Sequence, residues 1–223
     1  MRPVILSRGL VALFAAAVSF GAIVQAQAAE TLRIGYQKYG TLVLLKAKGS
    51  LEKRLAEQGI EVQWTEFPGG PQLLEGLNVG SIDFGTTGEA PPVFAQSANS
   101  ELVYVAWEPP APQSVAMVVP QHSAIRTIAD LRGKRIALNK GSNVHWLLLQ
   151  ILEEAGLGLN DVRIVYTPPK YPLTASDYLA VDAWMMWDPL LSDAEHTGEL
   201  RVVANGEGQI GRASCRERVS SPV

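Results

Sequence analysis

The chain has 223 residues, of which 47% are hydrophobic, and a formal net charge of −3 at pH 7. This composition is typical of a globular protein, and the charge balance lacks the basic excess expected of a nucleic-acid-binding domain. The only cysteine, Cys215, excludes an internal disulfide, so a hydrophobic core has to hold the fold together.

The N-terminus has the pattern of an export signal. Arg2 and Arg8 precede or flank an apolar run at 9–24, and Ala26-Gln27-Ala28 follows as a cleavage site with small residues. These features predict a secretory signal peptide at 1–28 and an exported mature protein. A membrane anchor is the weaker interpretation, because the run is short and rich in Ala and Gly.

After the predicted signal peptide, strands alternate with helices. The first half is predicted to contain a strand at 31–36, a helix at 42–58 broken at Gly49, a strand at 61–67, a helix at 72–79, a strand at 82–84, a helix at 89–97 and a strand at 102–107. This order predicts an α/β lobe with a largely parallel sheet. Ligands of such sheets bind beyond the C-terminal strand ends, where Gln37, Gly69-Gly70 and Thr86-Thr87 are expected.

The functional interpretation depends most on the stretch after the strand at 82–84. Gly85-Thr86-Thr87-Gly88 is predicted to be a turn, and Pro91 and Pro92 suit the first turn of a helix. A Gly/Thr turn that leads into a helix start offers backbone N–H groups and two hydroxyls to a small anion. An ordinary turn between a strand and a helix explains this stretch equally well when it is taken alone.

A Pro-dense stretch at 108–112 predicts a stiff linker to a second lobe. That lobe is predicted to contain a strand at 114–119, a short helix from Thr127 to Leu131, a strand ending at Leu138, a helix at 144–155, a strand at 162–166, an irregular stretch at 167–172 and a strand running into a Pro-started helix at 180–189. Gly141-Ser142-Asn143 forms a second helix start, with Ser142 or Asn143 as the N-cap.

The two lobes show weak internal similarity. Ile82-Asp83-Phe84 with Pro91 downstream is similar to Val181-Asp182-Ala183 with Pro189 downstream. This similarity favours two lobes built on one plan, each of which contributes helix starts to a shared cleft.

Patterns for catalysis or metal binding are weak. The sequence contains no G-x-S-x-G, H-E-x-x-H, Walker A or G-x-G-x-x-G motif, and its three histidines lack clustered cysteines. Asp83 and Asp182 lie among apolar strand residues, which favours bonding to a turn backbone over acid–base catalysis. We therefore expect a protein that is not an enzyme, with no catalytic residues, no cofactor and no metal.

Neutral hydrogen-bond donors at the predicted turns favour the binding of a fully ionised oxyanion such as a sulfonate or sulfate. These donors are Gln37, Thr86, Thr87, Ser142 and Asn143. Trp184 and Trp187 either cover the tail of a ligand or pack in the core. The carboxylate of Glu89 either faces away from the anion, pairs with a lysine or binds a cationic part of the ligand.

Several segments together resemble the aliphatic sulfonate-binding proteins of bacterial ABC transporters, which are type II periplasmic binding proteins. The segments are Arg33-Ile34-Gly35-Tyr36-Gln37-Lys38, Glu66-Phe67-Pro68-Gly69-Gly70-Pro71-Gln72, Leu77-Asn78-Val79-Gly80-Ser81-Ile82-Asp83, Gly141-Ser142-Asn143-Val144-His145, Val181-Asp182-Ala183-Trp184 and Trp187-Asp188-Pro189. The resemblance implies a monomeric, periplasmic two-lobe clamp that closes on a sulfonate and docks on an ABC permease. It implies two mixed, mostly parallel sheets flanked by helices.

The resemblance also implies a set of ligand-binding residues. These are Gln37, Thr87, Gly88, Glu89, Gly141, Ser142 and Trp184, to which the turn analysis adds Asn143. The implied domains are an incomplete first lobe at 29–112 and a second lobe at 113–207.

The sequence departs from the family pattern in two places. Residues 170–179 do not match the helix that members place before Val181-Asp182-Ala183, and the second hinge strand and C-terminal helices of the family are missing. The Arg-rich tail at 208–223 is expected to be a non-native addition to a truncated chain. A genuine basic tail is the alternative.

Two other functional classes stay open at this point. A sulfinate desulfinase-like enzyme would need a cysteine nucleophile in the cleft, whereas Cys215 lies in the tail. A binder of taurine, nitrate or another small ligand would use the same fold, and a binder of a pyrimidine vitamin precursor would need more aromatic stacking.

Overall fold

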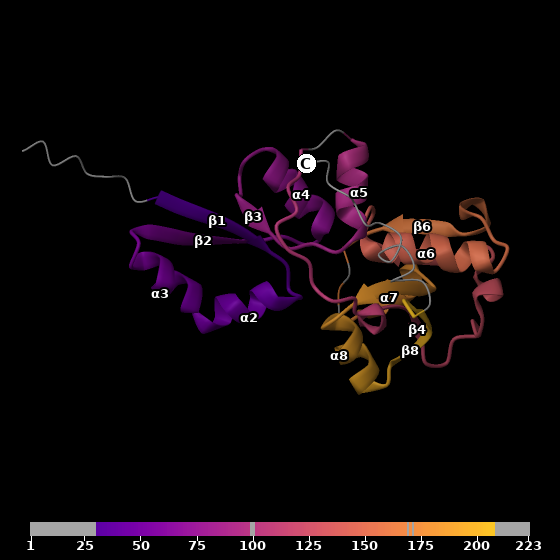
Figure 1. Ribbon diagram of the computed structural model, residues 1–223. Coiled ribbons are helices and arrows are strands. Elements are labelled where there is room, and N and C mark those ends of the chain that lie inside the picture. Colours follow the sequence, from indigo (N-terminus) through magenta and orange to yellow (C-terminus); the bar gives the residue numbers. More distant parts are fainter. Residues whose placement is uncertain (1–29, 99–100, 169, 171, 208–223) are drawn as a thin grey trace, which may run out of the picture. The chain divides into compact units, whose positions relative to one another are not determined.

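The computed structural model describes residues 30–98, 101–168, 170 and 172–207 (Figure 1). The predicted signal peptide and the tail with Cys215 lie outside these residues. From Thr31 onward the described residues belong to one compact unit that contains two separate sheets. The sheets lie on either side of the Pro-dense stretch in the sequence, and the lobe boundary after residue 112 stays a prediction.

The first sheet has three strands in the order β2-β1-β3. They are β1 (Glu30–Tyr36), β2 (Ile60–Glu66) and β3 (Phe84–Gly85). β1 is parallel to β3, with Ile34 opposite Phe84. The helices of this part are α2 (Thr41–Lys48), α3 (Ser50–Ala56), α4 (Gly70–Asn78) and α5 (Ala90–Ser97).

Most of the predicted elements of the first sheet are confirmed, including the break at Gly49. This residue has φ +59°, a left-handed conformation that favours glycine and ends α2. The strand predicted at 82–84 is displaced to Phe84–Gly85. The N–H of Ile82 bonds to the carbonyl of Gly76 at 3.4 Å, so Ile82 is buried in a turn rather than in the strand.

The prediction of a strand at 102–107 is wrong. Residues 101–111 have no regular structure, and Val103 and Trp107 are 86% and 81% exposed. An alternating sequence forms a strand only where it hydrogen-bonds to a neighbouring strand, and this segment joins neither of the two described sheets.

The second sheet has five strands in the order β6-β5-β7-β4-β8. They are β4 (Val115–Pro120), β5 (Arg135–Leu138), β6 (Arg163–Tyr166), β7 (Ala183–Trp187) and β8 (Leu200–Asn205). β5 is parallel to β6 and β7, whereas β4 is antiparallel to β7 and β8. Only β4 therefore runs against the other four strands, and the sheet is mixed and mostly parallel, as predicted.

The helical elements of the second half include three that were not predicted from the sequence. They are η1 (Pro112–Ser114), η2 (Ile128–Leu131), α6 (Asn143–Glu154), η3 (Leu159–Asp161), α7 (Ala175–Ala180) and α8 (Leu190–Thr197). Thr127 caps η2 as predicted, through a reciprocal bond with Asp130. Thr174 and Asp177 cap α7 in the same way. Their spacing in the sequence is that of a capping box and could have predicted the start of this helix.

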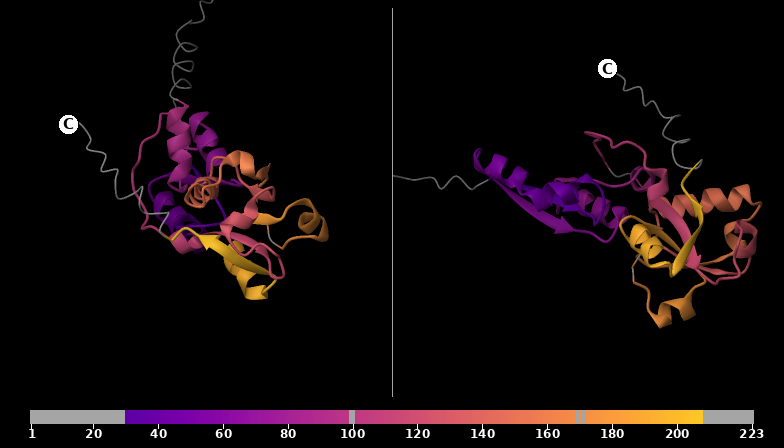
Figure 2. Two further views of the ribbon diagram at one scale, coloured as in Figure 1. Left: turned by 90° about the vertical axis from the view of Figure 1, so that its right-hand side faces the viewer. Right: turned by 90° about the horizontal axis from the view of Figure 1, so that it is seen from below.

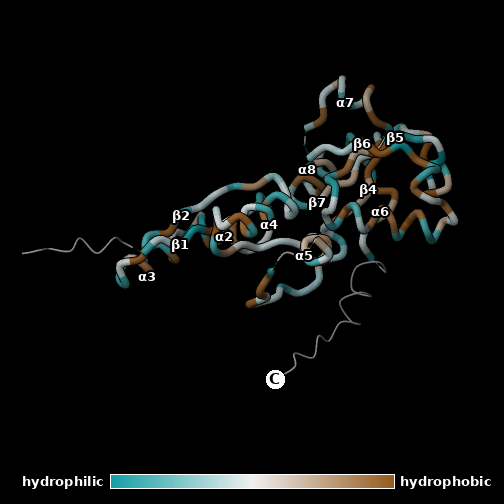
Figure 3. Tube along the Cα trace, turned by 90° about the horizontal axis from the view of Figure 1, so that it is seen from above, coloured by the Kyte–Doolittle hydropathy of each residue, from teal (hydrophilic) through white to brown (hydrophobic). Residues whose placement is uncertain are grey.

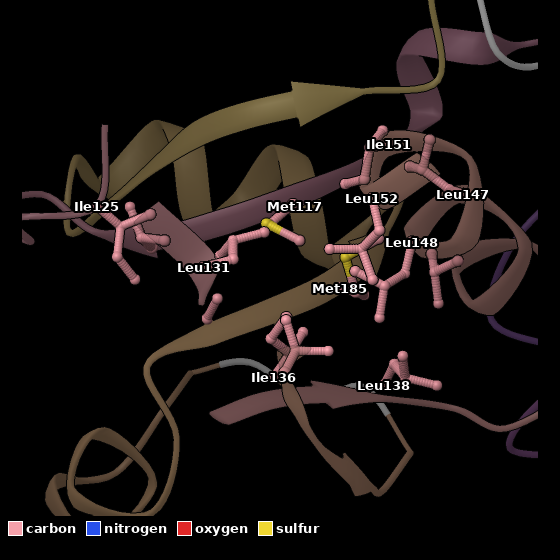
Figure 4. Packing of buried hydrophobic residues seen from close by; sticks show 14 of the residues in the cluster. Met117, Ile125, Leu131, Ile136, Leu138, Leu147, Leu148, Ile151, Leu152 and Met185 are labelled. Atoms are coloured by element: carbon pink, nitrogen blue, oxygen red, sulfur yellow. The ribbon is translucent and has the colours of Figure 1, made fainter. Parts of the chain in front are cut away.

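The second sheet has a hydrophobic core on each face because side chains alternate along its strands. Met117 of β4, Ile136 of β5 and Met185 of β7 pack against α6, where Leu148 and Leu152 are buried (Figure 4). The alternate residues pack against α8 in a second cluster, Ala116, Val118, Ala137, Leu173, Val181, Trp184, Met186, Leu191, Ala194 and Leu200. α6 and α8 therefore cover opposite faces (Figure 2), and β4 is hydrophobic along its length (Figure 3).

The chain enters and leaves the second sheet at one place. The N–H of Gly206 donates to the carbonyl of Pro112 at 3.0 Å and to that of Val115 at 3.1 Å. These bonds join the first and last residues of the segment that forms the five-stranded sheet.

Parallel strands in both sheets begin with the same ion pair. Asp83 accepts the backbone N–H of Arg33 at 2.8 Å and binds its guanidinium. Asp182 accepts the backbone N–H of Arg135 at 2.8 Å and its guanidinium at 3.0 and 3.2 Å. In each pair the arginine also donates to the carbonyl three residues before the aspartate. The internal similarity and a structural role for both aspartates are confirmed, but the aspartates bond to strand backbone and to arginine side chains rather than to a turn.

Candidate anion-binding site

The turn after β3 and the start of α6 are in direct contact through Asn143. Its Nδ2 donates to Oε2 of Glu89 at 2.6 Å, and its Oδ1 accepts the backbone N–H of Ala90 at 3.2 Å. Gly88 makes this approach possible, since a Cβ there would lie 2.2 Å from Nδ2 of Asn143. The amide of Asn143 thus occupies the N-terminus of α5, and the two predicted helix starts lie together.

The exposed Glu89 has a neutral partner that the sequence analysis did not consider. Of the three roles left open for it, a lysine pair is not observed among the described residues, where Asn143 takes one carboxylate oxygen. A glutamate held by an amide keeps its negative charge available to a cationic group of a ligand.

Gln37 fixes the turn after β3 to the turn after β1. Its side chain is 5% exposed, and its Nε2 donates to the carbonyl of Thr86 at 3.0 Å. Gln37 therefore uses a donor to hold the turn in place. Thr87 differs, because its Oγ1 is buried without a hydrogen-bond partner.

The turn before α6 is held by its own polar groups. Ser142 is buried and its Oγ donates to the carbonyl of Asn139 at 2.7 Å, so Ser142 is the N-cap by position but makes no side-chain cap bond. The N–H of Gly141 donates to Nδ1 of His145 at 3.1 Å. Burial, and secondarily the charge of Lys140, lower the pKa of His145, which keeps the imidazole neutral and able to accept this bond.

Trp184 lies in a different place from the turn residues. It is 5% exposed, contacts Tyr178 edge to face at a centroid distance of 5.5 Å, and lines a cavity of about 220 Å³. That cavity is also lined by Leu138, Thr167 and Asp177, and by none of the predicted turn residues. The structure brings Gln37, Thr87, Gly88, Glu89, Gly141, Ser142 and Asn143 into one region of contacts and leaves Trp184 outside it. Trp187 packs against the core cluster on the other face of the sheet.

A second cavity adjoins the turn contact. It has a volume of about 290 Å³ and lies between α4, α5 and the turn before α6, lined by Pro71, Leu74, Glu75, Pro91, Phe94 and Gly141. Phe94 stacks on His145 at 6.2 Å, which ties α5 to the first turn of α6.

The described residues contain no cluster of side chains suited to catalysis or to metal binding. Asp83 and Asp182 are bound by arginines at the strand ends opposite the turns, and no group of three or more metal-ligating side chains occurs in the described parts. The same residues contain no helix that is long and apolar enough to cross a membrane.

A family model described as NMT1/THI5 like matches residues 55–205. The chain belongs to the NMT1/THI5-like family. Within this family, it is 47% identical over 190 residues to a protein of Escherichia coli K12 that is named for binding aliphatic sulfonates, and it is 28% identical over 155 residues to the taurine-binding periplasmic protein of that organism. The two matches cover 85% and 70% of this chain.

Solved structures agree with this assignment. The alkanesulfonate-binding protein SsuA from Xanthomonas axonopodis pv. citri, bound to MOPS, matches with a TM-score of 0.75 and 50% identity over 81% of this chain. The periplasmic aliphatic sulphonate binding protein SsuA from Escherichia coli matches with a TM-score of 0.64 and 47% identity, also over 81% of this chain. These matches confirm the expected α/β periplasmic binding protein fold, and the similar proteins are binding proteins.

The chain spans only part of these relatives. It covers 59% of the Escherichia coli sulfonate-binding sequence, 48% of the taurine-binding sequence and 63% and 62% of the two SsuA chains.

Proposed function

We propose that this chain is a periplasmic solute-binding protein that captures an aliphatic sulfonate and delivers it to an ABC permease. The observation that carries the proposal is the meeting of two helix starts at Asn143, with Thr87 and Gly88 beside it. At α5 the N–H of Ala90 bonds to Asn143, and Pro91 and Pro92 have none, so α5 contributes its positive dipole end while the start of α6 offers N–H groups to an oxyanion. The sulfonate-binding relatives at 47% and 50% identity support the choice of ligand.

A sulfonate suits this region because it stays fully ionised at physiological pH and needs only hydrogen-bond donors. We infer export through the predicted signal peptide at 1–28 from the periplasmic relatives. Capture as a monomer, the permease partner and transport for sulfur uptake belong to the same proposal.

The direct test is a titration of the purified full chain, followed by tryptophan fluorescence. Ethanesulfonate and MOPS should bind saturably and more tightly than nitrate or sulfate, and Thr87→Ala should weaken them. Thr65→Ala, an exposed change on β2, is the matched control. Failure of the wild-type chain to bind any sulfonate would contradict the proposal, and release of sulfite from a sulfinate would favour the enzyme alternative instead.

Taurine is a second candidate ligand because of Glu89. This carboxylate is exposed at the turn after β3, where it can face the ammonium group of a zwitterion. Glu89→Gln should then weaken taurine binding and leave ethanesulfonate binding unchanged. Equal losses for both ligands would show that Glu89 supports the turn through Asn143 rather than contacting the ligand.

A further inference from the structure

The cavity of about 220 Å³ that Trp184 lines lies under α7, apart from the turns of the proposed sulfonate region. All of its lining residues belong to 137–186, in the second half of the chain. None of the turn residues Gln37, Thr87, Glu89 and Asn143 lines it. The proposed function therefore leaves this space without a role.

The cavity exists because α7 covers its face of the sheet incompletely. α6 has twelve residues and buries five of them, whereas α7 has six residues, none of which is buried. Val165 of β6 lies opposite Ala137 of β5, and both line the cavity. Val165 is 39% exposed, so this apolar part of the sheet is only partly covered by the short helix.

Apolar and aromatic side chains form the floor of the cavity. Trp184 and Met186 of β7 are 5% and 0% exposed, and Ala137 and Leu138 of β5 are 3% and 1% exposed. Apolar cavities bind apolar molecules, and about 150 Å³ is enough for benzene. An aromatic ligand gains further from ring contacts with tryptophan and from sulfur contacts with methionine.

The rim of the cavity carries two charges that offset each other. Nζ of Lys170 binds Oδ1 of Asp177 at 2.6 Å, and both residues line the cavity. Lys170 and, after it, Thr174 lower the pKa of Asp177 to about 2, so the carboxylate is ionised at neutral pH and balances the ammonium group. A charged ligand would have to break this pair or enter an apolar space unpaired, whereas a neutral ligand does neither.

We propose that the cavity under α7 is a second binding site, which takes a neutral aromatic molecule of one or two rings. The ring lies against Trp184 and Met186 on the floor, with Val165 and Ala180 beside it at the rim. The site goes beyond the proposed function and is independent of it, because no residue of the turns lines the cavity.

The first test measures the binding of indole to the full chain by calorimetry and thermal unfolding. Indole should bind saturably and raise the melting temperature as its concentration increases. Val165→Phe places a ring at the cavity from the edge strand β6 and should weaken indole binding by about tenfold or more. Val79→Phe, the same change at a 69% exposed valine that does not line the cavity, is the matched control.

Ala180→Leu, at an exposed position on the rim, repeats the test with a smaller perturbation of the fold. Both cavity variants should keep the wild-type circular dichroism spectrum and ethanesulfonate affinity. A loss of indole binding that is limited to these two variants supports the site. An equal loss in Val79→Phe would contradict it.

The second test separates a neutral ring from a charged one. Nitrobenzene and benzoate have nearly the same shape, but only benzoate carries a negative charge. Both are titrated with saturating ethanesulfonate present, so that the sulfonate region is occupied. Nitrobenzene should bind more tightly by about tenfold or more, because the apolar floor penalises the charge of benzoate.

Three results would overturn the inference and leave the proposed function standing. The first is a full chain that binds no indole, or cavity variants that bind it as tightly as the wild type. The second is tighter binding of benzoate than of nitrobenzene. The third is displacement of indole by ethanesulfonate, which would make the cavity part of the sulfonate site rather than a second site.

Discussion

Replacing Asp182 by asparagine tests whether the ion pairs at the strand ends hold the second sheet together. The variant keeps the size of the side chain but loses the negative charge. Asp182 accepts the backbone N–H of Arg135 at 2.8 Å and two guanidinium bonds at 3.0 and 3.2 Å. An asparagine can still accept the backbone N–H of Arg135. The variant therefore loses the charge-assisted bonds to the Arg135 guanidinium.

The magnitude follows from these bonds. Hydrogen bonds to charged groups contribute about 1.5–3 kcal/mol, and exposure of the Asp182 and Arg135 side chains by 31% and 37% reduces that through solvent screening. We expect the free energy of unfolding to fall by about 1–2 kcal/mol. For a chain of this size that corresponds to a melting temperature lower by roughly 2–8 °C.

The pH dependence gives a second check. The guanidinium of Arg135 lowers the pKa of Asp182, while burial opposes this shift. A carboxyl whose pKa is lowered by folding contributes stability above its unfolded pKa of about 3.9 and loses it as the pH falls through the folded pKa. The gap between wild type and Asp182→Asn should therefore be constant from pH 8 to pH 5 and narrow below about pH 4.

The assay is thermal unfolding followed by circular dichroism, with Glu154→Gln, an exposed change at the end of α6, as the control. Sulfonate affinity at 25 °C should be unchanged, because the ion pair lies at the strand ends away from the turns. A melting temperature equal to that of wild type, or a gap that persists unchanged at pH 3, would refute the reasoning.

Three further changes test other features. Gly88→Ala puts a Cβ 2.2 Å from the amide of Asn143, so it should cost about 1–3 kcal/mol at this contact and weaken ethanesulfonate binding measured by calorimetry. His145→Gln should reduce the loss of stability between pH 7 and pH 5, because burial and a nearby lysine lower the pKa of His145 and only the unfolded chain takes up its proton just below pH 6.5. An equal loss of unfolding free energy in the variant and the wild type, measured by urea titration at both pH values, would contradict this. Lysines at both Val103 and Val105, which are 86% and 70% exposed, should reduce self-association in light scattering, and unchanged scattering would show that this segment does not mediate it.

The sequence predicted the elements whose signals are local. Alternation located β1 and β2, glycine located the break between α2 and α3, and Thr127 located η2. These features depend on residues within a few positions of one another. Local patterns are therefore enough to find them.

Features that depend on distant partners were missed or misplaced. The alternating segment at 102–107 is not a strand, because it pairs with neither of the two described sheets. β8 was not predicted from the sequence. This strand is defined by its antiparallel pairing with β4, across a separation of about 80 residues in sequence.

The candidate site shows the same division. The sequence indicated both helix starts, but nothing in it could indicate that Asn143 contacts Glu89 or that Asn139 lies against Gly69. Those contacts join residues more than 50 positions apart, and only the fold brings them together. Trp184 is the reverse case, since the family resemblance implied a ligand contact, whereas the structure places Trp184 in a cavity that none of the predicted turn residues lines.

The bonds from Gly206 to Pro112 and Val115 have a consequence for how the protein can be taken apart. A segment whose two ends meet can be excised or transplanted without breaking the connectivity of its host. Residues 112–206 therefore form a natural cassette, and exchanging it between sulfonate- and taurine-binding relatives needs only two adjacent junctions.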